Sequence, residues 1–147
     1  MNNQVLTGFS LFLLLCTIGC QKGVTVHGIV TFSDGKPLEK GLVCFQSEKI
    51  VARGEIGPNG TYRLSTNASR DGVPEGNYKV YIADAFDKQV FPLPANDSGP
   101  IQYPIETPLI DSKLFDPATS GITCQVTKGM KRFDITVQPP TIQPPQE

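Results

Sequence analysis

The sequence predicts an all-β protein, a seven-stranded antiparallel β-sandwich, from three observations. Several short segments alternate apolar and polar residues with a period of two, which is the pattern of half-buried strands. Gly, Pro, Asn or Asp bound each of these segments, and turn signals spaced roughly every 8–12 residues are typical of two packed antiparallel sheets. Sustained apolar spacing of three and four, which would indicate amphipathic helices, does not occur beyond the first twenty residues.

The alternation places the expected strands along the chain. They lie at residues 24–32, 41–47, 50–56, 62–66, 78–82, 122–126 and 133–137. In the first strand Val30 shares the inward face with Gly28, which leaves His27 on the outward face. Gly60 and Gly76 each stand two residues before a tyrosine. We expect each glycine to take the positive φ of a tight turn and each tyrosine to enter the core with its hydroxyl at the rim.

The alternation is lost between residues 83 and 119. Prolines interrupt every candidate strand there, at Pro92, Pro94, Pro100, Pro104, Pro108 and Pro117. The sequence therefore predicts a long Pro-rich irregular loop. The stretch from Phe91 to Pro108 is the candidate contact loop, with four apolar residues set among its prolines: Phe91, Ile101, Tyr103 and Ile105. The alternative for this segment is a structural flap that covers a sheet edge.

A short apolar stretch from Val5 to Ile18 opens the chain. It is too short to span a bilayer stably, and it lies where the apolar region of a signal peptide belongs. The next residues end in Gly-Cys at Cys20 and resemble a lipobox, the site where signal peptidase II leaves a diacylated cysteine as the new N-terminus. We therefore predict a lipoprotein with its signal peptide at 1–19 and its lipid anchor and linker at 20–23. A plain secretory signal or an uncleaved membrane anchor is the alternative.

Composition and the lipid anchor together predict where the protein acts. Attached acyl chains would hold the domain at a membrane, since each buried CH₂ contributes about 0.8 kcal/mol. By resemblance to a known sorting rule, Gln21 after the cysteine favours the outer membrane of the cell envelope. A net charge of -1 without a basic cluster argues against nucleic acid as a partner. We expect one folded domain at 24–138 and a disordered Pro-rich tail at 139–147.

Three segments resemble a known family when they are taken in order. They read VTVHGIVTFSDGKPLEKGLVCF, GEIGPNGTYRLST and DGVPEGNYKVYI, and the later FDPATSGITCQVTKGMKRFDITV is similar to the end of the same proteins. The family is that of the carboxypeptidase regulatory-like domains, and in particular the small lipoproteins of planctomycetes. This resemblance covers nearly all of residues 24–138. It implies a transthyretin-like (prealbumin-like) β-sandwich with no catalytic domain of its own.

Residue types that carry chemistry are sparse. His27 is the one histidine in the sequence, and without a Cys-x-x-Cys motif it makes a zinc site improbable. Asp71-Gly72 and the Asn-Asp-Ser-Gly run at 96–99 lack the spacing of a calcium loop, so we expect them to form turns. The sequence therefore predicts no metal, no cofactor and no enzyme. An enzyme would have to use unpaired carboxylates of the irregular region, namely Asp84, Asp87, Asp111 and Asp116.

Cys44 and Cys124 remain in the predicted mature domain, in an oxidising compartment where a disulfide could form. The alternation puts Cys124 on the inward face of its strand, beside Val126. Cys44 falls on the face opposite Phe45, so the two Cβ vectors are expected to diverge. A disulfide and two separate thiols are both left open, with the pattern favouring the thiols.

These observations favour a lipid-anchored, non-catalytic protein of the cell envelope that acts as a structural or protein-interaction module. Its expected partners are the membrane, through the anchor, and an envelope protein or polysaccharide. A carbohydrate-binding module of the cell surface is the alternative, although the sequence has no Trp on which a sugar could stack.

Overall fold

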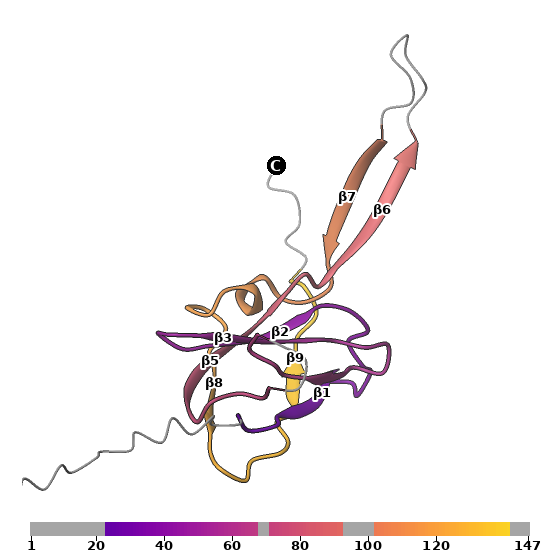
Figure 1. Ribbon diagram of the computed structural model, residues 1–147. Coiled ribbons are helices and arrows are strands. Elements are labelled where there is room, and N and C mark those ends of the chain that lie inside the picture. The colour runs from indigo at the N-terminus through magenta and orange to yellow at the C-terminus, as the bar shows by residue number, and fades with distance from the viewer. Residues whose placement is uncertain (1–22, 68–70, 93–101, 142–147) are drawn as a thin grey trace, which may run out of the picture.

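The computed structural model describes residues 23–67, 71–92 and 102–141 (Figure 1). Nine strands and one short 3-10 helix lie in this part of the chain. They are β1 (His27–Phe32), β2 (Leu42–Gln46), β3 (Val51–Glu55), β4 (Thr61–Arg63), β5 (Gly76–Ala83), β6 (Phe86–Pro92), β7 (Gln102–Pro108), η1 (Ser112–Phe115), β8 (Ile122–Val126) and β9 (Ile135–Val137). The predicted all-β class is confirmed. The predicted signal peptide at 1–19, the anchor Cys20 and the end of the tail lie outside the described residues.

The strands form three sheets. One sheet has four antiparallel strands in the order β3-β2-β5-β8, and a second has three strands in the order β4-β1-β9. β6 and β7 form a separate two-stranded sheet. In the three-stranded sheet β1 runs parallel to β9, with Val30 opposite Ile135. The expectation of a wholly antiparallel arrangement is therefore wrong at this pair.

Buried side chains from the three-stranded and four-stranded sheets form one hydrophobic core. Phe45 of β2 is 0% exposed, and its ring meets Phe133 edge-on at 5.6 Å between centroids and Tyr78 at 6.0 Å. The inward residues named by the alternation, such as Val30 and Val126, are buried as predicted, and His27 is exposed as predicted. A period of two thus identified the core face because a pleated strand turns alternate residues to opposite sides.

Two tyrosines tie the core to loops through their hydroxyls. Tyr62 donates to the carbonyl of Phe133 at 2.5 Å, and Tyr78 donates to the carbonyl of Pro74 at 2.8 Å. Burial raises the pKa of Tyr62, which keeps the hydroxyl protonated as a donor. Gly60 has the expected positive φ of 75°, and both tyrosine rings are buried. The two Gly-x-Tyr motifs are therefore structural.

The segment predicted to be an irregular Pro-rich loop contains the β6–β7 hairpin, so that prediction is wrong, as is the count of seven strands. Pro104 lies opposite Val90, and Pro108 lies opposite Phe86. Because proline has no N–H, these pairs must be the non-hydrogen-bonded ones of the ladder, and Pro92 falls in the same set. At each proline the backbone nitrogen without a hydrogen therefore faces away from the paired strand. The prolines thus remove no hydrogen bond from the hairpin.

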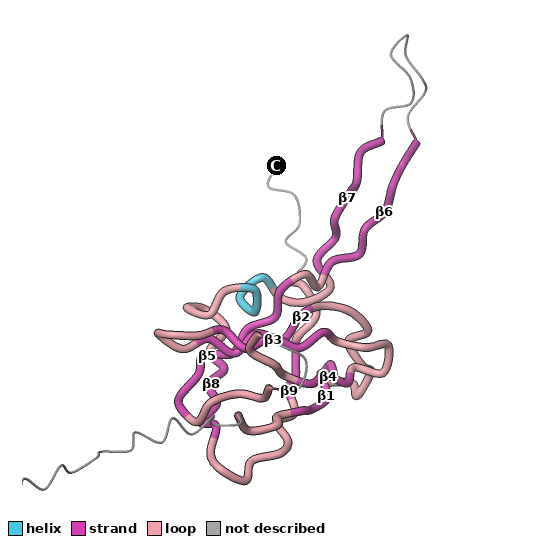
Figure 2. Tube along the Cα trace, in the orientation of Figure 1, coloured by secondary structure: helices cyan, strands magenta, loops and turns pink. Residues whose placement is uncertain are grey.

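The hairpin of β6 and β7, which we call the arm, projects beyond the two larger sheets (Figure 2). The chain leaves β5 at Asp84, whose φ of 55° turns it out of the sheet. At the base of the arm Phe86 stacks on Phe115 of η1, with 4.8 Å between ring centroids and an interplanar angle of 8°. Lys40 adds an ion pair to Asp87 at 3.3 Å. The base of the arm is therefore fixed to the body by side-chain contacts.

Candidate functional site

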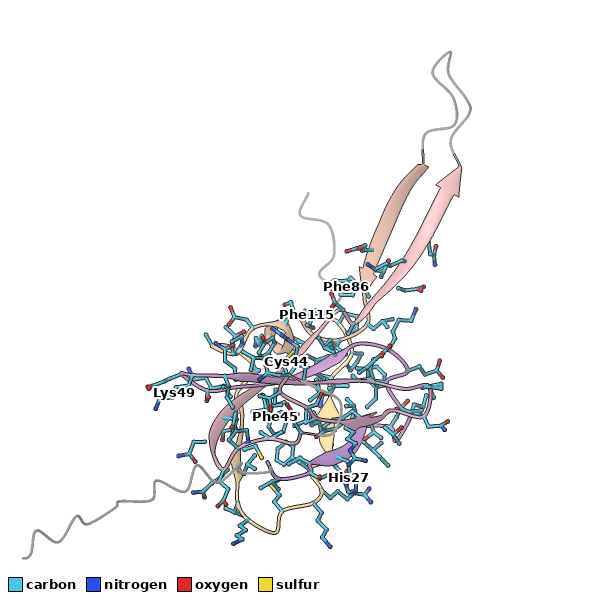
Figure 3. The ribbon with its side chains drawn as sticks, viewed as in Figure 1. His27, Cys44, Phe45, Lys49, Phe86 and Phe115 are labelled. Carbon is cyan, nitrogen blue, oxygen red and sulfur yellow. The ribbon has the colours of Figure 1, made fainter. Side chains whose placement is uncertain are left out.

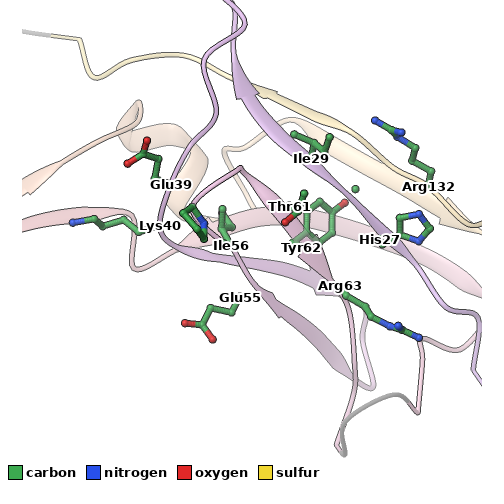
Figure 4. Close-up of a pocket in the computed structure, with 13 residues that line it drawn as sticks. His27, Ile29, Glu39, Lys40, Glu55, Ile56, Thr61, Tyr62, Arg63 and Arg132 are labelled. Atoms are coloured by element: carbon green, nitrogen blue, oxygen red, sulfur yellow. The ribbon is translucent and has the colours of Figure 1, made fainter.

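A groove of about 850 Å³ lies along the outer face of β1 and β4 (Figure 4). Half-buried Ile29 and buried Ile56 and Tyr62 contribute apolar surface to it. Its remaining lining includes several acidic and basic side chains, namely His27, Glu39, Lys40, Glu55, Arg63 and Arg132. Figure 4 shows these side chains at two ends, with Glu39, Lys40 and Glu55 on one side and the other three opposite.

The second end of the groove is a row of three basic side chains, Arg63, His27 and Arg132, which we call the cationic row. Arg63 of β4 is the antiparallel partner of His27 on β1. Arg132 is the partner of His27 on the other side, through a parallel bridge. All three side chains are exposed. Adjacent strands lie about 4.8 Å apart, so the row spans roughly 10 Å across the sheet.

Asp134 holds one member of the cationic row in place. Its two carboxylate oxygens accept hydrogen bonds from Nε of Arg132 at 2.9 and 2.8 Å, and one of them also accepts from the backbone N–H of Ile29 at 3.0 Å. The hydrogen bond from Arg132 lowers the pKa of Asp134, which keeps this carboxylate charged. In the described part of the chain no hydrogen bond or ion pair engages the side chain of Arg63.

Sequence reasoning placed His27 on an outward face but did not identify Arg63 or Arg132 as candidates. The alternation through Tyr62 and Leu64 could have placed Arg63 outward. Arg132 carried no such signal, because its position beside His27 depends on the parallel pairing of residues 131–133 with β1. Such a pairing joins segments about a hundred residues apart, and local patterns do not encode it.

A second groove, of about 600 Å³, opens at the end of the four-stranded sheet. Its lining is largely amides and hydroxyls: Gln46, Ser47, Asn77, Thr123 and Gln125, together with Glu48, Tyr78, Lys79 and Cys124. Amides and hydroxyls can bond sugar hydroxyls, but stacking a sugar also requires an open aromatic face. Tyr78, the aromatic residue of this lining, is 3% exposed. The geometry therefore gives little support to the carbohydrate-binding alternative.

The two cysteines of the domain are free thiols, each buried. Cys44 lies beside Phe45 on β2 (Figure 3), but Phe45 and Cys124 belong to the shared core, and Cys44 faces Arg53 and Tyr81 on the other side of the sheet. Burial raises the pKa of both thiols, which makes them poor nucleophiles. Of the two alternatives left open by the sequence, a disulfide and two separate thiols, the structure has the separate thiols. They lie on opposite faces of the four-stranded sheet.

The residues predicted as a contact loop fall on the arm. Phe91 of β6 lies opposite Tyr103 of β7, and Gln89 lies opposite Ile105, whose side chain is 53% exposed. Ile101 lies outside the described residues. The register therefore brings three members of the predicted set onto two neighbouring strands of one hairpin.

Three of the four carboxylates that an enzyme would have to use have structural partners, and the fourth, Asp84, lies in a shallow depression. Asp87 pairs with Lys40, Asp111 accepts the Lys113 N–H at the start of η1, and Asp116 accepts the Ala118 N–H. Asp84 lines a shallow depression of about 290 Å³ with Glu55, and both are exposed. Within the described ranges no group of three or more His, Cys, Asp or Glu side chains could hold a metal ion. The carboxylate of Asp71 accepts hydrogen bonds from the backbone N–H groups of Thr66 and Asn67. These bonds belong to the turn expected at this position.

Comparison with known proteins leaves the family open. No model of a known protein family matches the chain, and no curated protein sequence matches it. Among solved structures, a 9R-lipoxygenase from Cyanothece is similar over 95% of this chain and 18% of that chain, at 12% identity and a TM-score of 0.32. This chain thus spans less than a fifth of the lipoxygenase, and a superposition of that quality carries no argument about fold or function. In the described residues no helix is long and apolar enough to cross a membrane.

Proposed function

We propose that this chain is a lipid-anchored, non-catalytic protein of the cell envelope that contacts another envelope protein through its arm. The observation that carries the proposal is the arm itself, a two-stranded ribbon that projects from the body and is fixed at its base by the Phe86–Phe115 stack. A two-stranded hairpin is at best marginally stable on its own in water, and pairing with a further strand would stabilise it. The membrane through Cys20 and an envelope protein or polysaccharide remain the proposed partners, with the outer membrane as the proposed site.

The finer fold belongs to the same proposal. We propose that the three-stranded and four-stranded sheets form a sandwich of the carboxypeptidase regulatory-like, transthyretin-like kind. Two features support this arrangement: all seven segments with alternating patterns contain strands, and the two sheets share one core. The arm is then an addition between β5 and β8, placed where it leaves the packed faces undisturbed.

The prolines favour one edge of the arm for this contact. Outward backbone groups of β7 belong to residues 102, 104, 106 and 108, and two of these are prolines without an N–H. Outward groups of β6 belong to residues 86, 88, 90 and 92, and only Pro92 among these has no N–H, so three outward donors remain on β6 against two on β7. Prolines on an edge strand prevent pairing with other chains. The β6 edge is therefore the side at which a partner strand can add to the arm.

Lys88→Pro is expected to weaken the partner contact about tenfold, because it removes one outward donor from the β6 edge. The hairpin should persist, since residue 88 belongs to the non-hydrogen-bonded set. Photo-crosslinking in native envelope membranes, from a photoreactive residue in place of exposed Ile105, measures the yield of the crosslinked partner.

The matched control is Glu106→Pro. Lys88 and Glu106 form an ion pair at 3.0 Å, so both variants lose the same pair, but Glu106→Pro changes the edge that already carries two prolines. We expect its crosslinking yield to stay at the level of the unmodified arm. Equal losses in the two variants would show that the β6 edge is not the contact, and unchanged yields in both would remove the arm from the proposal.

Cys20→Ala is expected to abolish lipid attachment and to move the protein from the membrane fraction to the soluble fraction, because the acyl chains provide the membrane affinity. Labelling of cells with a palmitate analogue, followed by fractionation, measures both effects. Cys44→Ala, which alters a buried thiol of the folded domain, should keep the label. A labelled, membrane-bound Cys20→Ala protein would contradict lipid anchoring at this residue.

A further inference from the structure

Nearby carboxylates balance only part of the positive charge of the cationic row. Arg63 and Arg132 carry two positive charges beside His27, and Asp134 supplies one negative charge to them. The carboxylates that line the groove, Glu39 and Glu55, lie at its other end (Figure 4). The like charges of Arg63 and Arg132, on the two segments that flank β1, repel one another, so this arrangement costs free energy unless an anion offsets it.

The geometry of the row suits one small anion. Asp134 engages Nε of Arg132, so the terminal nitrogens of that guanidinium remain available to another acceptor. The guanidinium of Arg63 has no partner in the described residues. Arg132 and Arg63 lie on opposite sides of His27 (Figure 4), so both guanidiniums bind one anion when their exposed side chains turn toward the histidine. Arginine binds phosphate and carboxylate through two parallel hydrogen bonds, which adds geometric selectivity to charge.

We propose that the cationic row is a binding site for a phosphate group, with Arg63 and Arg132 as the two guanidinium ligands and His27 between them. The groove continues from the row over Ile29 and Ile56, so the molecule that carries the phosphate lies along this apolar floor. Glu39 and Glu55 at the far end disfavour a second anionic group there. Asp134 is a positioning residue, because it fixes Arg132 against the backbone of β1.

Two sources can supply such a group, a lipid headgroup or free phosphate. Under the proposed anchoring, His27 is the seventh residue after Cys20, so the row lies within roughly 25 Å of the anchor at full chain extension. This reach favours the headgroup as the source. The site itself depends on the described residues and stands without the anchor.

Calorimetric titration of the purified full-length protein, in non-ionic detergent at low ionic strength, tests the site with inorganic phosphate as the probe. We expect saturable binding of one phosphate per chain. Arg63→Ala should weaken the binding at least tenfold, and Arg63→Lys should restore part of it, since lysine keeps the charge but loses the paired donors. Arg63 is exposed, so the fold should persist, and a thermal melt of each variant checks this.

Lys131→Ala is the matched control. Lys131 is exposed, adjoins Arg132 and does not line the groove, so this variant removes the same charge without changing the row. We expect phosphate affinity to change less than twofold. An equal loss in Lys131→Ala and Arg63→Ala, equal affinity for chloride and phosphate, or no saturable binding would each overturn the proposal. Glycerol phosphate as a second probe distinguishes the sources: tighter binding than inorganic phosphate assigns the headgroup, and weaker binding assigns free phosphate.

Discussion

Replacing Gly28 with alanine is expected to destabilise the fold by about 3 kcal/mol or more, which is a large part of the stability of a small domain. A Cβ at this position would lie 1.9 Å from the carbonyl oxygen of Phe133 and 2.9 Å from a ring carbon of Tyr62. The first of these atoms belongs to the backbone that pairs with β1, where Phe133 N–H donates to the carbonyl of His27 at 2.9 Å. A new methyl group must therefore push the two paired segments apart.

Urea unfolding followed by circular dichroism measures this loss as a lower midpoint of the transition. Gly57→Ala is the control, because a Cβ there meets its nearest atoms, both of Thr61, at 3.6 Å, an ordinary contact, and the position has no positive φ. We expect its free energy of unfolding to stay within about 0.5 kcal/mol of that of the parent chain. A Gly28→Ala protein as stable as Gly57→Ala would show that the close approach of Phe133 to β1 is wrong.

The strands of the core could be predicted because each carries its own local signal. Val26 and Val30, or Tyr78 and Val80, alternate with residues that are exposed or only half-buried, and the structure buries each of the four. This signal arises from the pleat, which turns successive side chains to opposite faces whatever the strand pairs with. Burial of one face is therefore visible in the sequence, but the identity of the pairing strand is not.

The arm and the cationic row depend on information that the alternation does not contain. A proline opposes a strand only where its N–H would be bonded, so the prolines of residues 83–119 do not by themselves exclude a hairpin. Pro104 and Pro108 are four residues apart, so both fall on the same edge of β7, and this spacing could have shown that a hairpin was compatible with them. For Arg132 no comparable signal existed, because the bridge to His27 follows from the parallel pairing with β1.

Phe45→Ala is expected to cost about 3–5 kcal/mol, the range for removing a fully buried aromatic side chain. Phe45 is 0% exposed, and its ring lies between Phe133 and Tyr78 at the centre of the shared core. The variant leaves a cavity that neither sheet can close without losing its own strand pairing. Phe45→Leu should recover more than half of the loss, because leucine fills much of the same volume. Urea unfolding monitored by circular dichroism measures both variants.

Phe86→Ala provides the contrast that relates this core to the proposed function. Phe86 is half-buried and stacks on Phe115 at the base of the arm, so its removal should cost about 1–2 kcal/mol and loosen the arm while the shared core stays intact. Amide hydrogen exchange should then speed up in residues 86–92 and remain slow in β2 and β5. The arm would be part of the cooperative core if Phe86→Ala lowered the free energy of unfolding as much as Phe45→Ala. The same would follow if amide exchange rose equally in the arm and in the four-stranded sheet. A partner strand could not then add to the arm without affecting the stability of the whole domain.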